Sequence, residues 1–441
     1  MNAELQRNFW LELTPRRMTQ MAVVLALILL TVNVTPLGRA SEFVFEFLFY
    51  AIVVLWGTQS AALAVVGEIR GRTWDFQRLS ALTPFEMTLG KLLGATSYVW
   101  FGGLICLLII LARDLRDDPS RFFADLFYFP AMGLLSQAIA LFASLVAIRR
   151  RQTRTQFSAF QYQAVGVLAA YVVWQRLRDP LRSSDVMWWG WTIDGQEFHL
   201  ASLAVFLAWA LIGCYRLMRV ELQVQTYPTV WLAFILFMAA YMAGFESLSF
   251  LPQFLQANDP LSLRLMVPVA TLAFLTYVAV LFEPKDHVLY RWLAEMLAKG
   301  RTLAVMSRLQ CWMIAYAAAM VSGIAVALVG MSGISGLAFL TAPMVVAGLG
   351  FLTRDLGIFL FFGLAPGQKR GDMPAIITLG VLYLILPRLL GAAGVPEPAM
   401  LFYPLPLAGW IGAIFAWVEA AAMWFLVVSI RGKQTAALPQ T

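Results

Sequence analysis

The sequence predicts an all-α, polytopic integral membrane protein. Hydrophobic residues make up 61% of its 441 positions and charged residues only 13%, against roughly a quarter charged in soluble domains. Twelve apolar runs follow one another along the chain, each near the ~20 residues that an α-helix needs to cross a bilayer. The runs are continuously apolar rather than alternating, which favours helices over a barrel, because a helix satisfies its own backbone hydrogen bonds in lipid.

The twelve predicted spans form two sets of six. We expect them near residues 18–37, 43–66, 91–112, 123–147, 160–177, 199–217, 228–249, 263–282, 309–330, 334–352, 374–391 and 406–430. This spacing predicts a first six-helix half over residues 1–217, a short cytoplasmic connector over 218–227 and a second six-helix half over 228–441. We interpret the two halves as pseudo-repeats.

Charge sets the expected orientation. Loops that stay in the cytoplasm collect Lys and Arg, and with both termini inside, 23 of the 32 Lys and Arg residues fall on that side. The first apolar run, from Met18 to Thr35, is longer than the core of a signal peptide and lacks a convincing cleavage site, so we expect an uncleaved span. The net charge of +7 then needs only the lipid bilayer as its partner, and no nucleic acid is expected.

The polar segment between the second and third predicted spans carries the strongest local signals. Glu68 closes one helix, and Arg70, Arg72, Arg78 and Lys91 follow it. Later in the segment, Thr83 can cap the next helix, Pro84 takes its first position and Glu86 falls three residues after the cap. That pattern predicts a capping box at the start of the helix.

The order of these features resembles the permease subunits of type-2 ABC exporters. It runs from an acid that closes one helix through Gly-x-Thr, a short amphipathic stretch and Pro to Gly-Lys at the next helix. The residues concerned are Glu68, Gly71, Arg72, Thr73, Leu79, Leu82, Pro84, Gly90 and Lys91. In that family the segment meets a separate ATPase, so the resemblance implies the permease of an ATP-driven exporter in the bacterial inner membrane, with separate ABC ATPase subunits as partners.

The expected chemistry lies outside this chain. No Gly-x-x-x-x-Gly-Lys-Ser/Thr phosphate loop occurs in the sequence, so ATP would bind the partner subunit, and we expect neither an enzyme nor a bound cofactor. Glu68 ends its helix where the dipole favours cations, and we expect Arg72 or a basic group of the ATPase to pair with it. Nothing in the sequence selects a transported substrate.

The second half offers a weaker counterpart of the coupling segment. Glu283 closes the eighth predicted span and Arg308 precedes the ninth. The loop between them is charged and amphipathic, with Trp292 and other apolar residues at helical intervals. It lacks the Thr-Pro and Gly-Lys features of the first half.

Other features leave two further functions open. Glu419 lies deep in the last predicted span, where a charge costs ~2.5 kcal/mol or more, and it could serve helix packing or contact a substrate. Such a carboxyl keeps an ion-coupled secondary transporter as an alternative, and a non-transporting membrane scaffold is the third hypothesis. We also expect an interfacial, re-entrant or tilted helix over Asp355–Phe362, and an interfacial belt formed by Trp188, Trp189 and Trp191.

Overall fold

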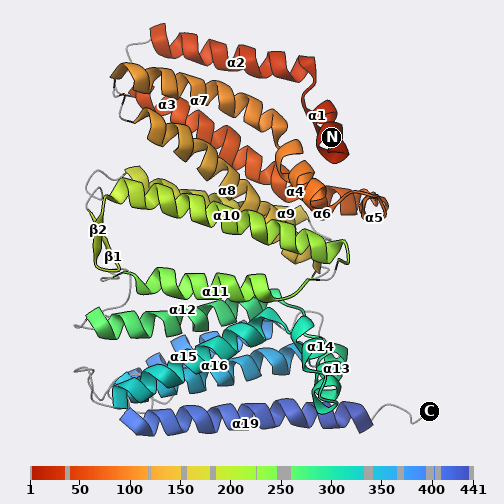
Figure 1. Ribbon diagram of the computed structural model, residues 1–441, viewed down its shortest axis with the longest axis vertical. Coiled ribbons are helices and arrows are strands. Elements are labelled where there is room, and N and C mark those ends of the chain that lie inside the picture. Colours follow the sequence, from red (N-terminus) through yellow and green to blue (C-terminus); the bar gives the residue numbers. More distant parts are fainter. Residues whose placement is uncertain are drawn as a thin grey trace. The chain divides into compact units, whose positions relative to one another are not determined.

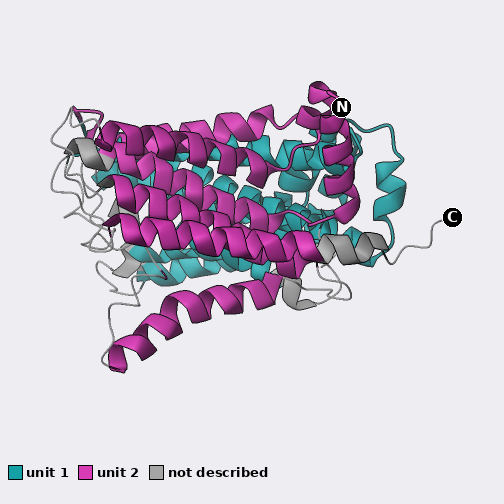
Figure 2. Cartoon of the chain, turned by 90° about the horizontal axis from the view of Figure 1, so that it is seen from below, with its two compact units in different colours: residues 1–186, 192–226 teal, residues 187–191, 227–441 magenta. Residues whose placement is uncertain are grey.

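The structure is a computed structural model of the chain. It describes residues 2–34, 40–117, 119, 121–149, 156–178, 185–224, 226–245, 260–331, 341–364, 372–393, 402 and 409–436. The chain divides into two compact units: unit 1 comprises residues 1–186 and 192–226, and unit 2 comprises residues 187–191 and 227–441 (Figure 2).

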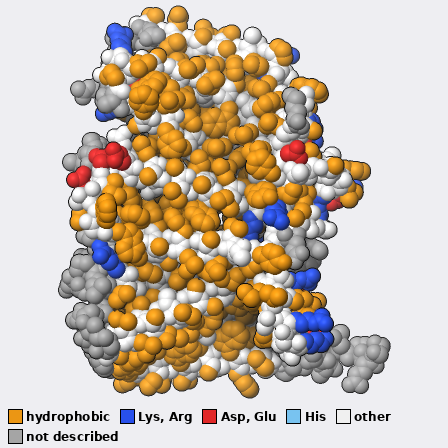
Figure 3. All heavy atoms as spheres, viewed as in Figure 1, with side chains coloured by type: hydrophobic (Ala, Val, Ile, Leu, Met, Phe, Trp, Pro, Cys, Tyr) orange, Lys and Arg blue, Asp and Glu red, His pale blue; other side chains and the backbone are white. Residues whose placement is uncertain are grey.

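The described residues include ten helices that are long and apolar enough to cross a membrane. Two shorter apolar helices, Phe160–Val173 and Thr229–Ala243, accompany them. On the face drawn in Figure 3, hydrophobic side chains cover the middle of the helices and charged side chains gather toward their ends. These features agree with the predicted all-α, multi-pass membrane class, whereas the count of twelve spans and the two-repeat layout stay predictions.

Unit 1 consists of helices and part of one short hairpin (Figure 1). Its α-helices are α1 (Ala3–Glu12), α2 (Pro15–Val34), α3 (Ala40–Phe49), α4 (Gly57–Arg70), α5 (Trp74–Arg78), α6 (Pro84–Leu89), α7 (Ser97–Asp117), α8 (Phe122–Arg149), α9 (Gln156–Arg178) and α10 (Gly195–Glu221). Helix α8 is the most buried of its candidate spans and packs on α4, α9 and α10. Helices α1, α5 and α6 lie at one end of the unit (Figure 1).

Two π-helices interrupt the α-helices of unit 1: η1 (Tyr50–Trp56) joins α3 to α4, and η2 (Gly90–Gly94) continues α6. The wider turn of a π-helix breaks the regular backbone ladder, and side chains of other helices bond to the carbonyls of η1. The Gln137 amide of α8 donates to the Val53 carbonyl at 3.0 Å, and Gln163 of α9 donates to the Leu55 carbonyl at 2.8 Å. The second predicted span therefore has a polar irregularity at its middle.

Unit 2 is built around a similarly buried helix. Its elements are α11 (Thr229–Ala243), α12 (Pro260–Phe282), α13 (His287–Ala298), α14 (Thr302–Ser307), α15 (Cys311–Met331), α16 (Thr341–Leu364), α17 (Asp372–Gly380), the π-helix η5 (Val381–Ile385), α18 (Leu386–Ala392) and α19 (Gly409–Ala436). Helix α16 is the most buried of its candidate spans and packs on α15, α17 and α19.

The structure corrects one local prediction and adds detail to another. Asp355–Phe362 is not a separate interfacial, re-entrant or tilted helix, because α16 runs unbroken through it and buries Asp355 completely. The predicted tryptophan belt contains a hairpin, with strands β1 (Val186–Trp188) and β2 (Trp191–Ile193). Its turn residues Trp189 and Gly190 have φ of 53° and 80°, which suits a type I′ turn with positive φ at both central positions.

Candidate functional site

Four charged side chains from three parts of unit 1 meet at the end of α4. Lys91 of η2 is 1% exposed, and its Nζ lies 2.7 Å from Oε1 of Glu4 and in ion-pair contact with Oε2 of Glu68. Arg7 places Nη2 2.8 Å from Oε1 of Glu4 and 2.7 Å from Oε1 of Glu68. We call Glu4, Arg7, Glu68 and Lys91 the α1 clamp, because they tie α1 to the connector that follows α4.

The charges of the α1 clamp balance. Two carboxylates face two cations, which is the condition under which buried charges are tolerated. Glu68 also accepts a hydrogen bond of 2.6 Å from the side-chain amide of Gln77 in α5. Glu68 therefore joins α4 to α1, α5 and η2. The expected pairing of Glu68 with Arg72 is wrong: Arg72 is exposed, and Lys91 and Arg7 hold the carboxylate instead.

Two glycines of η2 let α1 approach the backbone. A Cβ on Gly90 would lie 2.4 Å from Cγ of Glu4, and one on Gly94 would lie 2.8 Å from Cβ of Asn8. In the space so left, Asn8 donates from Nδ2 to the Gly90 carbonyl at 3.1 Å. Asn2 donates to the Glu86 carbonyl at 2.7 Å. The Gly90-Lys91 pair that sequence analysis singled out thus supplies both the contact surface and the counter-charge for α1.

The turn after α4 explains the Gly-x-Thr part of the segment. Gly71 ends the helix, Arg72 follows with φ of 58°, and the Thr73 N–H donates to the Glu68 carbonyl at 2.9 Å while the Arg72 N–H donates to the Ile69 carbonyl at 3.2 Å. This pair of bonds defines a Schellman motif. Arg72 occupies the left-handed position that usually carries glycine, and its side chain is exposed.

Helices α5 and α6 present both polar and apolar residues. Trp74 is buried and Leu82 packs against the core of the unit, whereas Phe76 and Leu79 are 76% and 86% exposed. We call Phe76 and Leu79 the α5 edge. Two such side chains on a short connector form an exposed apolar feature rather than part of the core.

The predicted capping box is confirmed. Thr83 is the N-cap of α6 and Pro84 is its first residue. The side chain of Glu86 accepts a hydrogen bond of 2.9 Å from the Thr83 N–H. The Thr83 hydroxyl accepts from the Glu86 N–H at 3.3 Å. Hydrogen bonds from the Thr83 backbone and hydroxyl hold the pKa of Glu86 below its usual value.

The counterpart segment of unit 2 is held by different contacts. Glu283 is buried and accepts a hydrogen bond of 3.2 Å from the Trp312 N–H, in the first turn of α15. Gln310 accepts bonds of 2.7 Å from both the Tyr290 hydroxyl and the Trp312 indole. The predicted residues Trp292 and Arg308 do meet, with the guanidinium 4.7 Å from the ring centre. None of these contacts joins Trp292 or Arg308 to Glu283.

Glu419 has a partner that sequence reasoning did not find. Nη1 of Arg354 in α16 donates to Oε2 of Glu419 at 2.6 Å, and Nε donates to Oδ1 of Asp355 at 2.9 Å. The hydroxyls of Tyr277 in α12 and Tyr383 in η5 each donate to Oδ2 of Asp355 at 2.7 Å. We call these five residues the Arg354 cluster. Arg354 and Asp355 are adjacent in the sequence, but the other three members are too far from them for spacing to have revealed the cluster.

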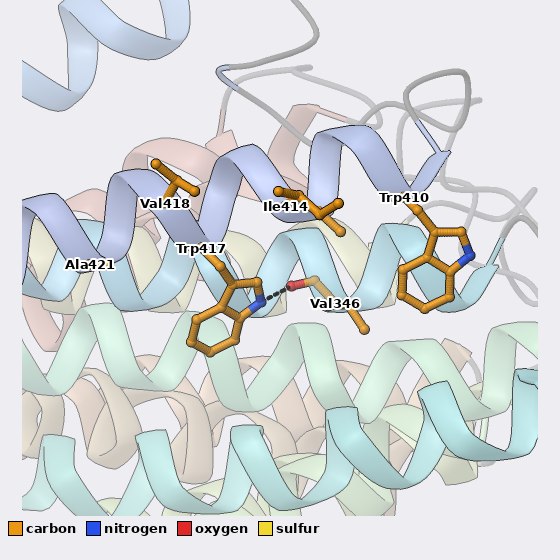
Figure 4. A pocket seen from close by; sticks show the side chains of 7 residues that line it. Val346, Trp410, Ile414, Trp417, Val418 and Ala421 are labelled. Atoms are coloured by element: carbon orange, nitrogen blue, oxygen red, sulfur yellow. Dashed lines mark hydrogen bonds between the residues drawn. The ribbon is translucent and has the colours of Figure 1, made fainter.

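A shallow apolar groove of about 420 Å³ lies between α16 and α19. It is lined by Val346, Trp410, Ala413, Ile414, Trp417, Val418 and Ala421. Figure 4 shows the Trp417 ring directed to the α16 backbone, where its indole N–H donates to the Val346 carbonyl at 3.1 Å. With no polar side chain but the indoles, this groove suits lipid chains rather than a polar substrate.

Comparison of the sequence with protein-family models finds no match, and comparisons with curated proteins and with solved structures find none either. Across the described residues, no three His, Cys, Asp or Glu side chains converge as a metal site would require. The α1 clamp with the α5 edge, and the Arg354 cluster, are therefore the two features on which a function can be argued.

Proposed function

We propose that this protein is the transmembrane permease of an ATP-driven exporter in the bacterial inner membrane, coupled to separate ATPase subunits through the segment 68–91. The observation that carries the proposal is the combination of an exposed apolar α5 edge with a charged clamp directly behind it. The resemblance to type-2 ABC permeases includes three of these residues, Glu68, Leu79 and Lys91. Under this proposal both termini and α1 lie in the cytoplasm.

The contacts suit the transmission of force. Helix α5 has only five residues and could not resist a push by itself. Gln77 of α5 bonds to Glu68, which closes α4, and Glu68 pairs with Lys91 of η2. A displacement of α5 would therefore move the second and third predicted spans together, with α1 following through Glu4 and Arg7.

The two-half arrangement also belongs to the proposal. The boundary between the compact units, at Thr226 and Tyr227, falls inside the predicted connector 218–227. In unit 2, α14 exposes Leu303 and Met306 beside the Trp292–Arg308 contact. We propose that α13 and α14 receive the second ATPase subunit.

The first test reverses the charge of Glu68. Glu68→Lys would place a third cation against Lys91 and Arg7, so we expect an inserted protein that loses co-purification of the ATPase and the stimulation of its ATP hydrolysis. Glu12→Lys is the control, because Glu12 makes an exposed pair with Arg17 at 3.0 Å. Equal and near-normal values for both variants would contradict the coupling assignment.

The second test changes the contact surface without touching the clamp. Leu79→Ser removes an exposed side chain, so the fold should be unaffected while the ATPase is lost. Leu115→Ser near the end of α7 is a matched control, with a side chain 57% exposed. If a phosphate-loop ATPase co-purifies equally with wild type and Leu79→Ser, the α5 edge is not the docking surface.

The Arg354 cluster favours a second candidate, an ion-coupled secondary transporter, because charged groups within a membrane commonly mark ion pathways. Transport assays in sealed vesicles separate the two. An exporter needs ATP and the ATPase subunits, whereas a secondary transporter works from an ion gradient with this chain alone. Transport under neither condition would favour the scaffold hypothesis.

A further inference from the structure

The Arg354 cluster lies at the middle of its helices. Arg354 and Asp355 are 4% and 0% exposed and are the only charged residues of α16, whose candidate span is Ala342–Leu364. Glu419 is the only charged residue of the candidate span Gly409–Ser429. Within the described part of the chain, the other ionisable groups that bond to the cluster's charged side chains are the hydroxyls of Tyr277 and Tyr383.

The charges of this cluster do not balance, in contrast to those of the α1 clamp. One guanidinium faces two carboxyl groups, 2.9 Å from Asp355 and 2.6 Å from Glu419. If both carboxyls were ionised, a net negative charge would stand in the hydrocarbon layer. Such an uncompensated charge costs several kcal/mol, and two carboxyls that share one site do not both ionise readily.

We infer that the Arg354 cluster is a proton-binding site, in which the Asp355 and Glu419 carboxyls together hold a single proton. With that proton the cluster is neutral. Because the two carboxyls share one guanidinium, the proton belongs to the pair and not to one residue. Glu419 is the more accessible of the two carboxyls, since its side chain is 27% exposed whereas that of Asp355 is fully buried.

The proton would also set how firmly α19 is attached. Apart from the Arg354–Glu419 contact, α19 bonds to the α16 backbone through the indoles of Trp417, at 3.1 Å from the Val346 carbonyl, and Trp424, at 2.9 Å from the Thr353 carbonyl. The ion pair is the contact among these that depends on protonation. This inference is independent of the proposed ATPase, because it needs no residue of unit 1.

Infrared spectroscopy of the whole protein in lipid bilayers tests the charge count. At neutral pH, the wild type should show the carbonyl band of one protonated carboxyl that both Glu419→Gln and Asp355→Asn abolish, because each variant leaves one guanidinium facing one carboxylate. Glu86→Gln, which changes an exposed carboxyl, should leave the band intact. Arg354→Met should about double it, since two carboxyls then lack a counter-charge.

A double variant keeps the test decisive if Arg354→Met fails to insert. In the double variant Arg354→Met with Glu419→Gln, Asp355 alone remains, so the band lost in Glu419→Gln should return. Retention of the full band in both Glu419→Gln and Asp355→Asn would overturn the inference. So would a wild-type band that appears only when sodium is removed, because the cluster would then hold a sodium ion in place of the proton.

Discussion

The segments after α4 and after α12 begin alike and are held together differently. Each follows a long apolar helix that ends near a glutamate, Glu68 or Glu283. Glu68 lies in a network of four charges that includes the N-terminal helix α1. Glu283 instead accepts a backbone N–H in the first turn of α15, where the helix dipole favours an anion. The same residue type thus serves as an ion-pair centre in one segment and as a helix cap in the other.

This difference indicates which of the two segments can respond to a partner. Arg7 of the α1 clamp is 44% exposed, so an incoming charge can rearrange its ion pair with Glu68. The buried cap at Glu283 has neutral neighbours such as Gln310 and Tyr290 and is insensitive to charge. We therefore expect the first connector to be the regulated one and the second to be a fixed support. Four changes test this comparison.

The largest effect is expected for Lys91→Met. It leaves Arg7 as the one cation of the α1 clamp that faces Glu4 and Glu68, and removal of one member of a buried charge network costs about 3–5 kcal/mol. Unfolding in detergent measures the loss. Lys299→Met is the control, because Lys299 forms an exposed pair with Glu295 on one helix. Similar stabilities of the two variants would show that the α1 clamp is not structural.

Neutral replacement of the two glutamates compares the connectors directly. Glu68→Gln loses charge-assisted contacts to Lys91 and Arg7 and should cost about 1.5–3 kcal/mol. Glu283→Gln retains an acceptor for the Trp312 N–H and loses only its attraction to the helix dipole, typically below about 1 kcal/mol. Equilibrium unfolding measures the loss of stability in both variants. Equal losses would contradict the distinction between an ion pair at Glu68 and a helix cap at Glu283.

A single added methyl group tests how closely α1 packs on η2. Gly90→Ala places a Cβ against Glu4, and overpacking of this kind costs about 1–3 kcal/mol. Gly67→Ala is the matched control on α4, since no atom lies within 4 Å of its added Cβ. We expect the control to gain slightly from helix propensity. A stable Gly90→Ala protein would mean that α1 does not depend on close contact with η2.

The smallest effect concerns the capping box of α6. Because the pKa of Glu86 in the folded protein is below its usual value of 4.5, its contribution to stability is present above that value and is lost as pH falls through the folded pKa. Glu86→Gln should therefore flatten the acid side of the pH–stability profile. Thr83→Ala should flatten the profile likewise. A profile unchanged in both variants would mean that the capping box does not contribute to the pH dependence of stability.

Local patterns in the sequence were sufficient for the capping box and the helix after Pro84. They also singled out Glu68 and Lys91, which the fold brings into an ion pair. They were insufficient for Glu4 and Arg7. These residues precede the first span, and only the fold brings Glu4 to Lys91 and Arg7 to Glu68. Proximity in sequence suggested Arg72 as one possible partner of Glu68, but Arg7 and Lys91 pair with it instead.

The error at Asp355–Phe362 has a similar origin. Arg354 and Asp355 interrupt the apolar pattern and so indicated the end of a span. Within the fold, Glu419, Tyr277 and Tyr383 bond to them, and the helix continues through both residues. Whether a charged residue can be buried depends on partners from distant segments of the chain. A hydropathy average over neighbouring residues does not include those partners.

The π-helix η1 has a consequence for helical phase. Each residue of an α-helix advances the side chains by about 100°, so deletion of one residue within Tyr50–Trp56 would rotate α3 by that angle relative to α4. Phe45 and Phe49, which are 5% and 0% exposed and belong to the core beside α7, would then turn away from it. The π-helix thus decides which face of α3 is buried, independently of the face that α4 presents to α8.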